Sequence, residues 1–98
     1  MNSHAQDVFY FNRYTDKNNI ERLVNGNVST YGNVITITDG MSRETYFIEE
    51  TLYDEDEQIY TFDIGDDKIV FDVPNKNIIV DDRVYRINST IKTNWWYS

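Results

Sequence analysis

Apolar and polar side chains alternate along most of the chain, with the period of two that is typical of half-buried β-strands. The segment 34–38, Val-Ile-Thr-Ile-Thr, shows this most clearly, and Asp39-Gly40 supplies a turn after it. Connections of two to five residues between such segments predict antiparallel neighbours. We predict strands over residues 8–14, 28–31 (the weakest), 34–38, 44–53, 58–64, 68–73, 77–81 and 84–88.

One stretch near the N-terminus has a helical period instead. Its apolar residues Ile20, Leu23 and Val24 share one helical face. Thr15 or Asp16 can cap the start of a helix, and Asn25-Gly26 can end it in a left-handed conformation. We therefore predict a short helix over residues 16–25. The competing interpretation makes residues 20–24 a strand and Asn25-Gly26 a hairpin turn.

Three consecutive hairpins in the second half of the chain can be aligned so that one face of the sheet is apolar. A two-residue turn at Gly65-Asp66 pairs Asp63 with Lys68 on the other face, and glycine suits the first position of a type II′ turn. Turns at Asn75-Lys76 and Asp82-Arg83 continue the same face. The predicted core face consists of Tyr60, Phe62, Phe71, Val73, Ile78, Val80, Tyr85 and Ile87.

The hairpin that precedes these three fits less well. A loop over residues 54–57 places Glu49 opposite Phe62, and a loop one residue longer places Glu50 there. An unpaired carboxylate on an apolar face is costly. Two explanations remain open: a β-bulge at Glu49-Glu50, or an open sheet edge at this point.

The chain of 98 residues is expected to form one domain, residues 1–98. The fold class that these elements predict is mainly β (α+β). It is an antiparallel meander sheet or small curled barrel of about six or seven strands, with one short N-terminal helix.

Charge is distributed unevenly along the chain. The net charge is −8, but residues 39–82 hold fourteen acids and three bases, and the other residues hold three acids and six bases. An acidic field of this kind repels nucleic acid and anionic lipid, and attracts basic partners or cations. We therefore expect no direct nucleic-acid binding and no membrane association.

Features that would indicate secretion or a membrane span are not found. The chain has no Cys, the start MNSHAQD has no apolar core of a signal peptide, and no apolar run approaches about 20 residues. These observations predict a cytoplasmic protein, in the bacterial host cell if a phage encodes it.

Motifs that would carry chemistry are weak or broken. His4 is the single histidine, and termini rarely host catalytic sites. Asp54, Asp56 and Gln58 imitate the start of an EF-hand loop, but Ile59 replaces its essential glycine. No Gly-rich phosphate-binding motif occurs. We expect no enzyme, cofactor or metal, although Glu49 or Glu50 would be a candidate acid if a pocket surrounded it.

Acidic residues in the middle of the chain are the remaining signal, because they are expected on turns or on the outward face of the meander. Regular carboxylates on a sheet can resemble the phosphates of a duplex and occupy a basic groove. The candidate partner-binding residues are Glu49, Glu50, Asp54, Glu55, Asp56, Glu57, Asp63, Asp66, Asp67 and Asp72. Candidate aromatic anchors are Tyr53, Trp95 and Trp96, because Trp and Tyr are favoured at interfaces.

In size, charge and lack of catalytic residues the chain resembles the small acidic inhibitors of bacteriophages and mobile elements, such as DNA-mimic anti-CRISPR and anti-restriction proteins. The resemblance is one of type, and no diagnostic motif carries it. It implies a non-enzymatic inhibitor of a basic, nucleic-acid-binding enzyme or complex. The alternative is a structural or assembly subunit that acts through a sheet edge or the C-terminal aromatic residues.

Overall fold

The computed structural model describes residues 6–92, and side chains up to residue 90. The mainly β prediction is confirmed, but the described residues form ten strands, which is more than expected. The strands are β1 (Gln6–Thr15), β2 (Glu21–Arg22), β3 (Gly26–Tyr31), β4 (Val34–Asp39), β5 (Ser42–Phe47), β6 (Glu50–Asp54), β7 (Ile59–Asp63), β8 (Lys68–Asp72), β9 (Asn77–Val80) and β10 (Arg83–Lys92).

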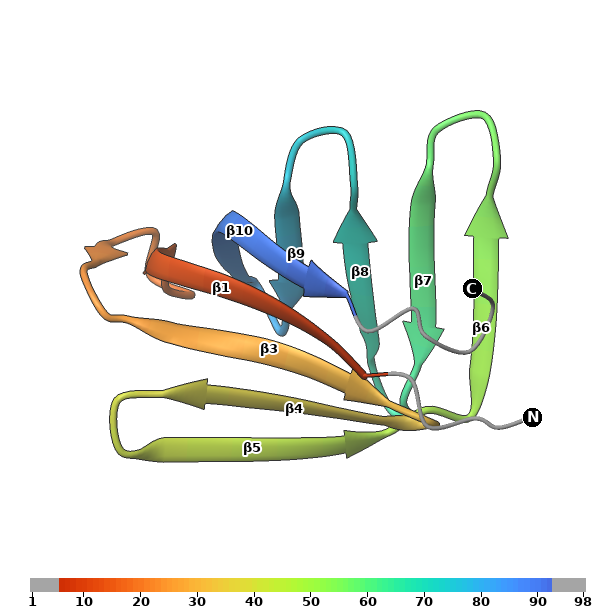
Figure 1. The fold of residues 1–98 in the computed structure, drawn as a ribbon, viewed down its shortest axis with the longest axis horizontal. Helices are drawn as coiled ribbons and strands as arrows, with labels where there is room; N and C mark the ends of the chain where they lie inside the picture. Colours follow the sequence, from red (N-terminus) through yellow and green to blue (C-terminus); the bar gives the residue numbers. More distant parts are fainter. Residues whose placement is uncertain (1–5, 93–98) are drawn as a thin grey trace.

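These strands form one antiparallel sheet that curls into a half-barrel. Its order is β5-β4-β3-β1-β10-β9-β8-β7-β6, and β2 pairs with the outer part of β1. The first and last long strands, β1 and β10, therefore pair in the middle of the sheet, whereas β5 and β6, consecutive in sequence, are its two edges. Figure 1 shows two walls, β3–β5 and β6–β9, that diverge from a corner where β5 leads into β6.

Backbone hydrogen bonds fix this corner. The N–H of Ile48 donates to the carbonyl of Asn33 at 2.7 Å, and the N–H of Glu49 donates to the carbonyl of Asp63 at 2.7 Å. Two successive residues thus bond to opposite walls. The predicted continuous strand 44–53 is wrong for this reason, since the chain changes walls at Ile48-Glu49.

The core lies between the two walls, and inward-facing residues of both contribute to it. Its buried members are Phe11, Val28, Ile35, Ile37, Ile69, Phe71, Ile78, Val80 and Tyr85. Burying each large apolar side chain contributes about 1.5–3 kcal/mol. Gly26 permits the close packing of β3 on β1, because a Cβ there would meet the Phe11 ring and the carbonyl oxygen of Thr38.

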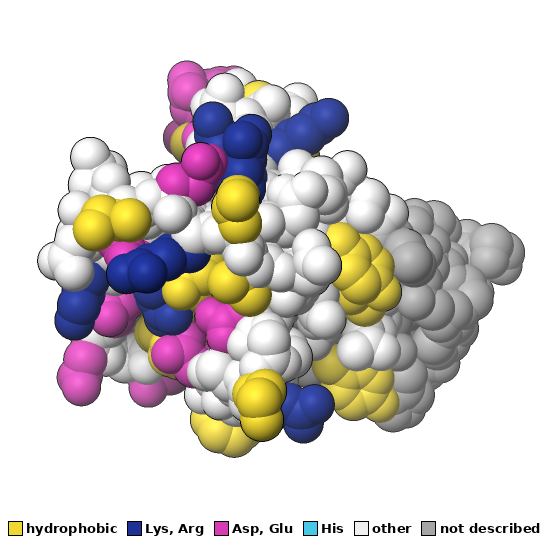
Figure 2. Space-filling view, turned by 90° about the vertical axis from the view of Figure 1, so that its left-hand side faces the viewer, with side chains coloured by type: hydrophobic (Ala, Val, Ile, Leu, Met, Phe, Trp, Pro, Cys, Tyr) yellow, Lys and Arg dark blue, Asp and Glu magenta, His cyan; other side chains and the backbone are white. Residues whose placement is uncertain are grey.

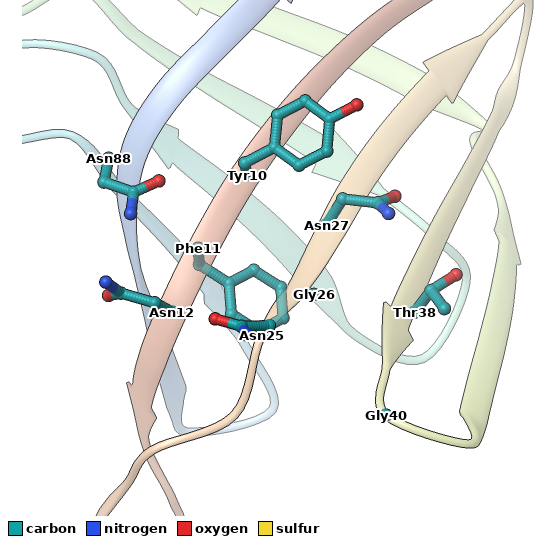
Figure 3. A pocket seen from close by; sticks show the side chains of 9 residues that line it. All are labelled: Tyr10, Phe11, Asn12, Asn25, Gly26, Asn27, Thr38, Gly40 and Asn88. Carbon is teal, nitrogen blue, oxygen red and sulfur yellow. The ribbon is translucent and has the colours of Figure 1, made fainter.

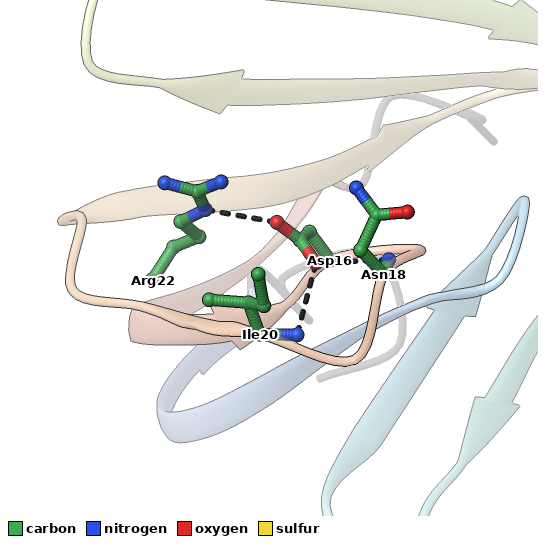
Figure 4. A network of polar contacts seen from close by, with 4 residues as sticks. All are labelled: Asp16, Asn18, Ile20 and Arg22. Atoms are coloured by element: carbon green, nitrogen blue, oxygen red, sulfur yellow. Dashed lines mark hydrogen bonds and ion pairs between the residues drawn. The ribbon is translucent and has the colours of Figure 1, made fainter.

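The predicted helix over residues 16–25 is wrong, since no described residue is helical. Asp16 does act as a cap, but of a turn. Its Oδ1 accepts hydrogen bonds from the N–H groups of Asn18 (2.9 Å) and Ile20 (3.0 Å), and its Oδ2 pairs with Arg22 Nε at 2.9 Å (Figure 4). Asn19, at φ 65°, completes the reversal. The competing strand interpretation is correct only for Glu21–Arg22, and Asn25-Gly26 leads into β3 rather than forming a hairpin turn.

Register in the β7–β8 hairpin agrees with the prediction. Asp63 pairs with Lys68 and Phe62 with Ile69, and Gly65 has the positive φ (104°) that its place in the turn requires. The next two turns differ from the prediction. The first was predicted as a two-residue turn at Asn75-Lys76 but is a four-residue loop, and the second was predicted one residue too far along the chain. The β8–β9 loop spans residues 73–76, and the β9–β10 turn is Asp81-Asp82.

Both errors shift the register by two residues, so the inward face is preserved. Phe71, Ile78, Val80 and Tyr85 are buried as predicted. Val73 is the exception, because the longer loop leaves it 50% exposed. Tyr60 is also marginal, at 36% exposed.

The predicted conflict between a glutamate and the apolar face disappears in the observed register. The β6–β7 loop spans residues 55–58, with Gln58 at φ 57°, so Thr51 lies opposite Phe62 and Glu50 lies opposite Asp63. Of the two explanations, the open edge is the one observed, since β6 is the last strand of the sheet.

Candidate partner-binding surface

Acidic residues concentrate on one end of the molecule, formed by β6, β7 and β8. Residues 49–72 hold ten carboxylates and one Lys, a balance of −9, and the rest of the chain holds seven acids and eight bases, a balance of +1. The opposite end, viewed in Figure 2, shows basic and acidic side chains side by side. The net negative charge is therefore a property of one wall.

The candidate acids fall into two clusters at opposite ends of these strands. The loop cluster contains Asp54, Glu55, Asp56, Glu57 and Asp72; the turn cluster contains Glu49, Glu50, Asp63, Asp66 and Asp67. Strand pairing places Asp54 and Asp72 on either side of Ile59, and Asp63 between Glu50 and Lys68. Glu50 and Asp54 are four residue steps apart on β6, which corresponds to about 13 Å along the strand.

An uncharged row crosses the outer face between the two clusters. Leu52 pairs with Thr61, Thr61 with Val70, and Val70 with Ile79. Leu52 is 57% exposed at the edge of this row. The expected regular array of acids is therefore two clusters flanking an uncharged band. The predicted strand over residues 77–81 would place Asp81 on the same face, but this residue lies in the β9–β10 turn.

Several of these aspartates stabilise turns. Asp54 Oδ1 accepts hydrogen bonds from the N–H groups of Asp56 (3.0 Å) and Glu57 (3.1 Å), and Asp63 Oδ1 accepts one from Gly65 (2.9 Å). The carboxylate of Asp67 accepts a hydrogen bond from the N–H of Lys68. The carboxylate of Asp72 accepts hydrogen bonds from the backbone and the side-chain amide of Asn75. Such bonds are the usual reason for Asp in turns.

Other acids have no structural role of this kind. Within the part of the chain that the structure describes, no hydrogen bond or ion pair engages the carboxylates of Glu50, Glu55, Asp56, Glu57 and Asp66. All five residues are exposed. Glu49 lies at the corner, where its carboxylate borders the turn at Gly65. These acids are the ones available to a partner.

A second polar group, which the sequence analysis missed, lies between the walls. Arg83 at the start of β10 forms a 2.8 Å ion pair with Glu44 of β5, and the hydroxyl of Tyr46 donates to the same Glu44 oxygen at 3.1 Å. The guanidinium also lies 5.6 Å from the centre of the Tyr85 ring. The contact between Glu44 and Arg83 spans 39 residues, which a local sequence pattern does not reveal.

Burial and charge shift the pKa values of this group. Desolvation, followed by the charge of Glu44, raises the pKa of Asp39 and that of Tyr46. Burial also raises the pKa of Tyr85, although the Arg83 charge opposes this. Burial alone would lower the pKa of Arg83, but its bond to Glu44 and the surrounding oxygens raise it. The group ties β5 to β10 with Arg83 kept charged.

A polar hollow of about 470 Å³ opens on the surface of β1, β3 and β10. Figure 3 shows Asn12 and Asn88 on one side of it, Asn27 and Thr38 on the other, and the Phe11 ring near Gly26. Its lining contains the amides of four Asn side chains and the hydroxyls of Tyr10 and Thr38, but no carboxylate, Lys, Arg or His. It therefore offers hydrogen bonds without a group that transfers protons near neutral pH.

The candidate aromatic anchors separate in the structure. Tyr53 lies on the inward face of β6, with its ring 4.3 Å from that of Tyr60, and is 48% exposed. Trp95 and Trp96 lie outside the described residues, as does His4.

Residues 6–92 hold no group of three or more His, Cys, Asp or Glu side chains arranged to bind a metal ion. No helix there is long and apolar enough to cross a bilayer. A scan of protein-family models, a search of curated proteins and a search of solved structures each give no match to the chain.

Proposed function

We propose that this chain is a non-enzymatic binding protein, an inhibitor that applies the acidic β6–β8 wall to a basic, nucleic-acid-binding surface of another protein. The observation that carries the proposal is the segregation of charge, −9 on residues 49–72 against +1 elsewhere. A merely solubilising charge has no reason to collect on one wall of the sheet.

The arrangement of the two clusters supports mimicry of a duplex. Two groups of negative charge flank an uncharged band, at a separation of about 13 Å along the strand. In B-DNA, phosphates flank a major groove about 12 Å wide. A basic surface that binds phosphates on both sides of a groove can bind both clusters and release its counterions as it would on DNA.

The test replaces the five acids that take no part in turns. In the variant, Glu50, Glu55 and Glu57 become Gln, and Asp56 and Asp66 become Asn. The tagged protein is used to capture partners from bacterial lysate at low and high salt, with a duplex oligonucleotide as competitor. We expect capture of a basic nucleic-acid-binding protein by the native chain, loss of capture at high salt or with competitor, and loss in the variant.

A matched control removes acids from the other end of the molecule. Glu21→Gln with Asp39→Asn changes charge on β2 and β4, away from the β6–β8 wall, so it should retain capture. If capture did not depend on salt concentration and the five-acid variant retained it, the acids would not be the groups that bind the partner.

The two open sheet edges favour a second candidate function, assembly into a larger complex. Phe47 at the β5 edge is 64% exposed, and Leu52 and Tyr53 at the β6 edge are 57% and 48% exposed. Unpaired strand edges are templates for strand addition. Light scattering distinguishes this candidate: a stable oligomer that Thr51→Pro converts to monomer supports edge assembly, and a monomer at all concentrations excludes self-assembly.

A further inference from the structure

An apolar cavity of about 580 Å³ lies on the concave side of the sheet. It is lined by residues of β1, β6, β7, β8, β9 and β10, including Phe9, Phe62, Phe71 and Ile87. Binding pockets in proteins have volumes of about 300–1,000 Å³ and mostly apolar linings, and covering apolar surface is favourable.

Aromatic rings line this cavity and continue past it to the edge of the sheet: Phe9, Phe71, Phe62 and Tyr60 belong to its lining, and Tyr53 lies beside Tyr60. We call the series Phe9, Phe71, Phe62, Tyr60 and Tyr53 the aromatic track. Successive ring centres are 5.2, 5.0, 6.0 and 4.3 Å apart. The first rings pack on the core, but Tyr60 and Tyr53 remain 36% and 48% exposed. The track therefore presents ring faces and edges that can receive further aromatic groups.

Strand β10, the last described element, ends at the start of this track. Thr90 pairs with Phe9, and Lys92 pairs with Asp7. Asp7, Phe9 and Thr90 all line the cavity. Residues 93–98 follow directly and carry Trp95, Trp96 and Tyr97 in succession. Six residues span at most about 20 Å, enough to reach along the track from Phe9.

A polar atom at the same place lacks a partner. Among the described residues, Oδ1 of Asp7 is buried and accepts no hydrogen bond. Buried acceptors are normally satisfied. Thr30, which pairs with Asp7, carries one donor, and the sequence from Lys92 onward adds an ammonium and two indole N–H groups.

We propose that the C-terminal segment 93–98 docks in this cavity in its own molecule, with its Trp and Tyr side chains packed on the aromatic track. Docking joins the end of β10 to the β6–β7 hairpin and covers apolar surface that the half-barrel leaves open. This inference is independent of the proposed function, because it concerns the concave face and not the acidic outer face.

The test uses the intrinsic fluorescence of tryptophan. Trp95 and Trp96 are the two tryptophans of the chain, so emission reports on this segment alone. We expect emission at shorter wavelength than that of N-acetyl-tryptophanamide, and several-fold weaker quenching by acrylamide. Tyr60→Lys, which places a charge on the track, should shift emission to longer wavelength and increase quenching.

Leu52→Lys is the matched control, because it introduces the same side chain on the outer face of the adjacent strand. It should leave emission unchanged. As a second measurement, the chain without residues 93–98 should bind the dye 8-anilinonaphthalene-1-sulfonate several-fold more strongly than the full chain does.

Three outcomes would overturn the proposal. Native emission and quenching that match N-acetyl-tryptophanamide would show that the segment is in water. Short-wavelength emission lost on dilution, together with a dimer in light scattering, would place the segment on a second copy. Equal dye binding with and without residues 93–98 would show that the segment does not occupy the cavity. If the deletion variant failed to fold, the comparison of Tyr60→Lys with Leu52→Lys would decide.

Discussion

Tyr46 and Tyr85 lie close to the same Glu44–Arg83 ion pair, but their hydroxyl groups have different surroundings. The Tyr46 hydroxyl donates to Glu44, whereas the buried Tyr85 hydroxyl has no hydrogen-bond partner among the described residues. We therefore expect Tyr85→Phe to leave the free energy of unfolding unchanged or raise it. Tyr46→Phe should lower it by about 1 kcal/mol. Urea denaturation of both variants checks the contrast, and equal losses would contradict it.

Alkaline pH should destabilise the fold through Tyr85. Burial raises its pKa above the ordinary value, so the folded protein retains a proton that the unfolded chain releases above pH about 10. Stability is therefore fully present below that pH and falls as pH rises beyond it. Denaturation midpoints measured across this range should fall less steeply in Tyr85→Phe. An identical slope in the variant would assign the effect to other groups.

Arg83 and Arg86 provide a matched pair on one strand. The Arg83 side chain is 18% exposed and bonds to Glu44 of β5. Arg86 is exposed, and among the described residues its one bonding partner is Asn77 on the neighbouring strand, at 3.1 Å. Arg83→Ala should lower the free energy of unfolding by about 1–2 kcal/mol, because a hydrogen-bonded charge is left without its partner. Arg86→Ala should change it by less than about 0.5 kcal/mol. Equal effects on the free energy of unfolding would show that the Arg83–Glu44 ion pair does not stabilise the fold.

At the scale of elements, side-chain alternation predicted which residues face inward more reliably than which residues pair. The β8–β9 and β9–β10 registers were each wrong by two residues, and Ile78, Val80 and Tyr85 are still buried, since a shift of two preserves the face. The turn positions were the weak step. Asp81-Asp82 adopts φ angles of 49° and 65°, which acidic residues adopt less readily than glycine.

The helix prediction failed for a related reason. Ile20, Leu23 and Val24 have helical spacing, yet Ile20 and Leu23 are 51% and 80% exposed, so no core holds them in a helix. The carboxylate of Asp16 bonds instead to a turn and to Arg22, and these bonds lower its pKa. An Asp followed by Asn residues fits a helix cap and a turn equally well.

The β9–β10 turn offers a way to stabilise the protein. Both of its central residues have positive φ, the geometry of a type I′ turn, in which Asn-Gly is preferred. Asp81→Asn with Asp82→Gly should raise the free energy of unfolding by about 0.5–1 kcal/mol. Asp66→Gly removes one charge at a position where φ is not positive, so it should bring no gain. Thermal and urea denaturation measure both.

At the scale of the whole molecule, local sequence patterns do not show which strands far apart in sequence pair with each other. The outward positions of Asp63 and Asp72 and the turn position of Asp66 and Asp67 follow from alternation and turn chemistry, whereas Asp81 and Glu50 lie elsewhere than expected. The division of the acids into two clusters depends on the β6–β7 register, which residues 55–58 set through the positive φ of Gln58. The pairing of β1 with β10, and the tie between Glu44 and Arg83, join residues far apart in sequence that no period connects.

The corner at Ile48-Glu49 makes this a molecule of two separable pieces. Residues 1–48 contain β1 to β5 and residues 49–98 contain β6 to β10, so within the described residues β1–β10 is the one strand pair between them. In each piece the strands pair with near neighbours in sequence, and ring contacts such as Phe11–Tyr85, with centres 4.8 Å apart, join the two pieces. A chain cut between residues 48 and 49 should therefore reassemble from its two fragments, with β10 of one adding to β1 of the other. Co-purification of the untagged fragment with the tagged one measures this, and failure to associate would show that covalent continuity at the corner holds the walls together.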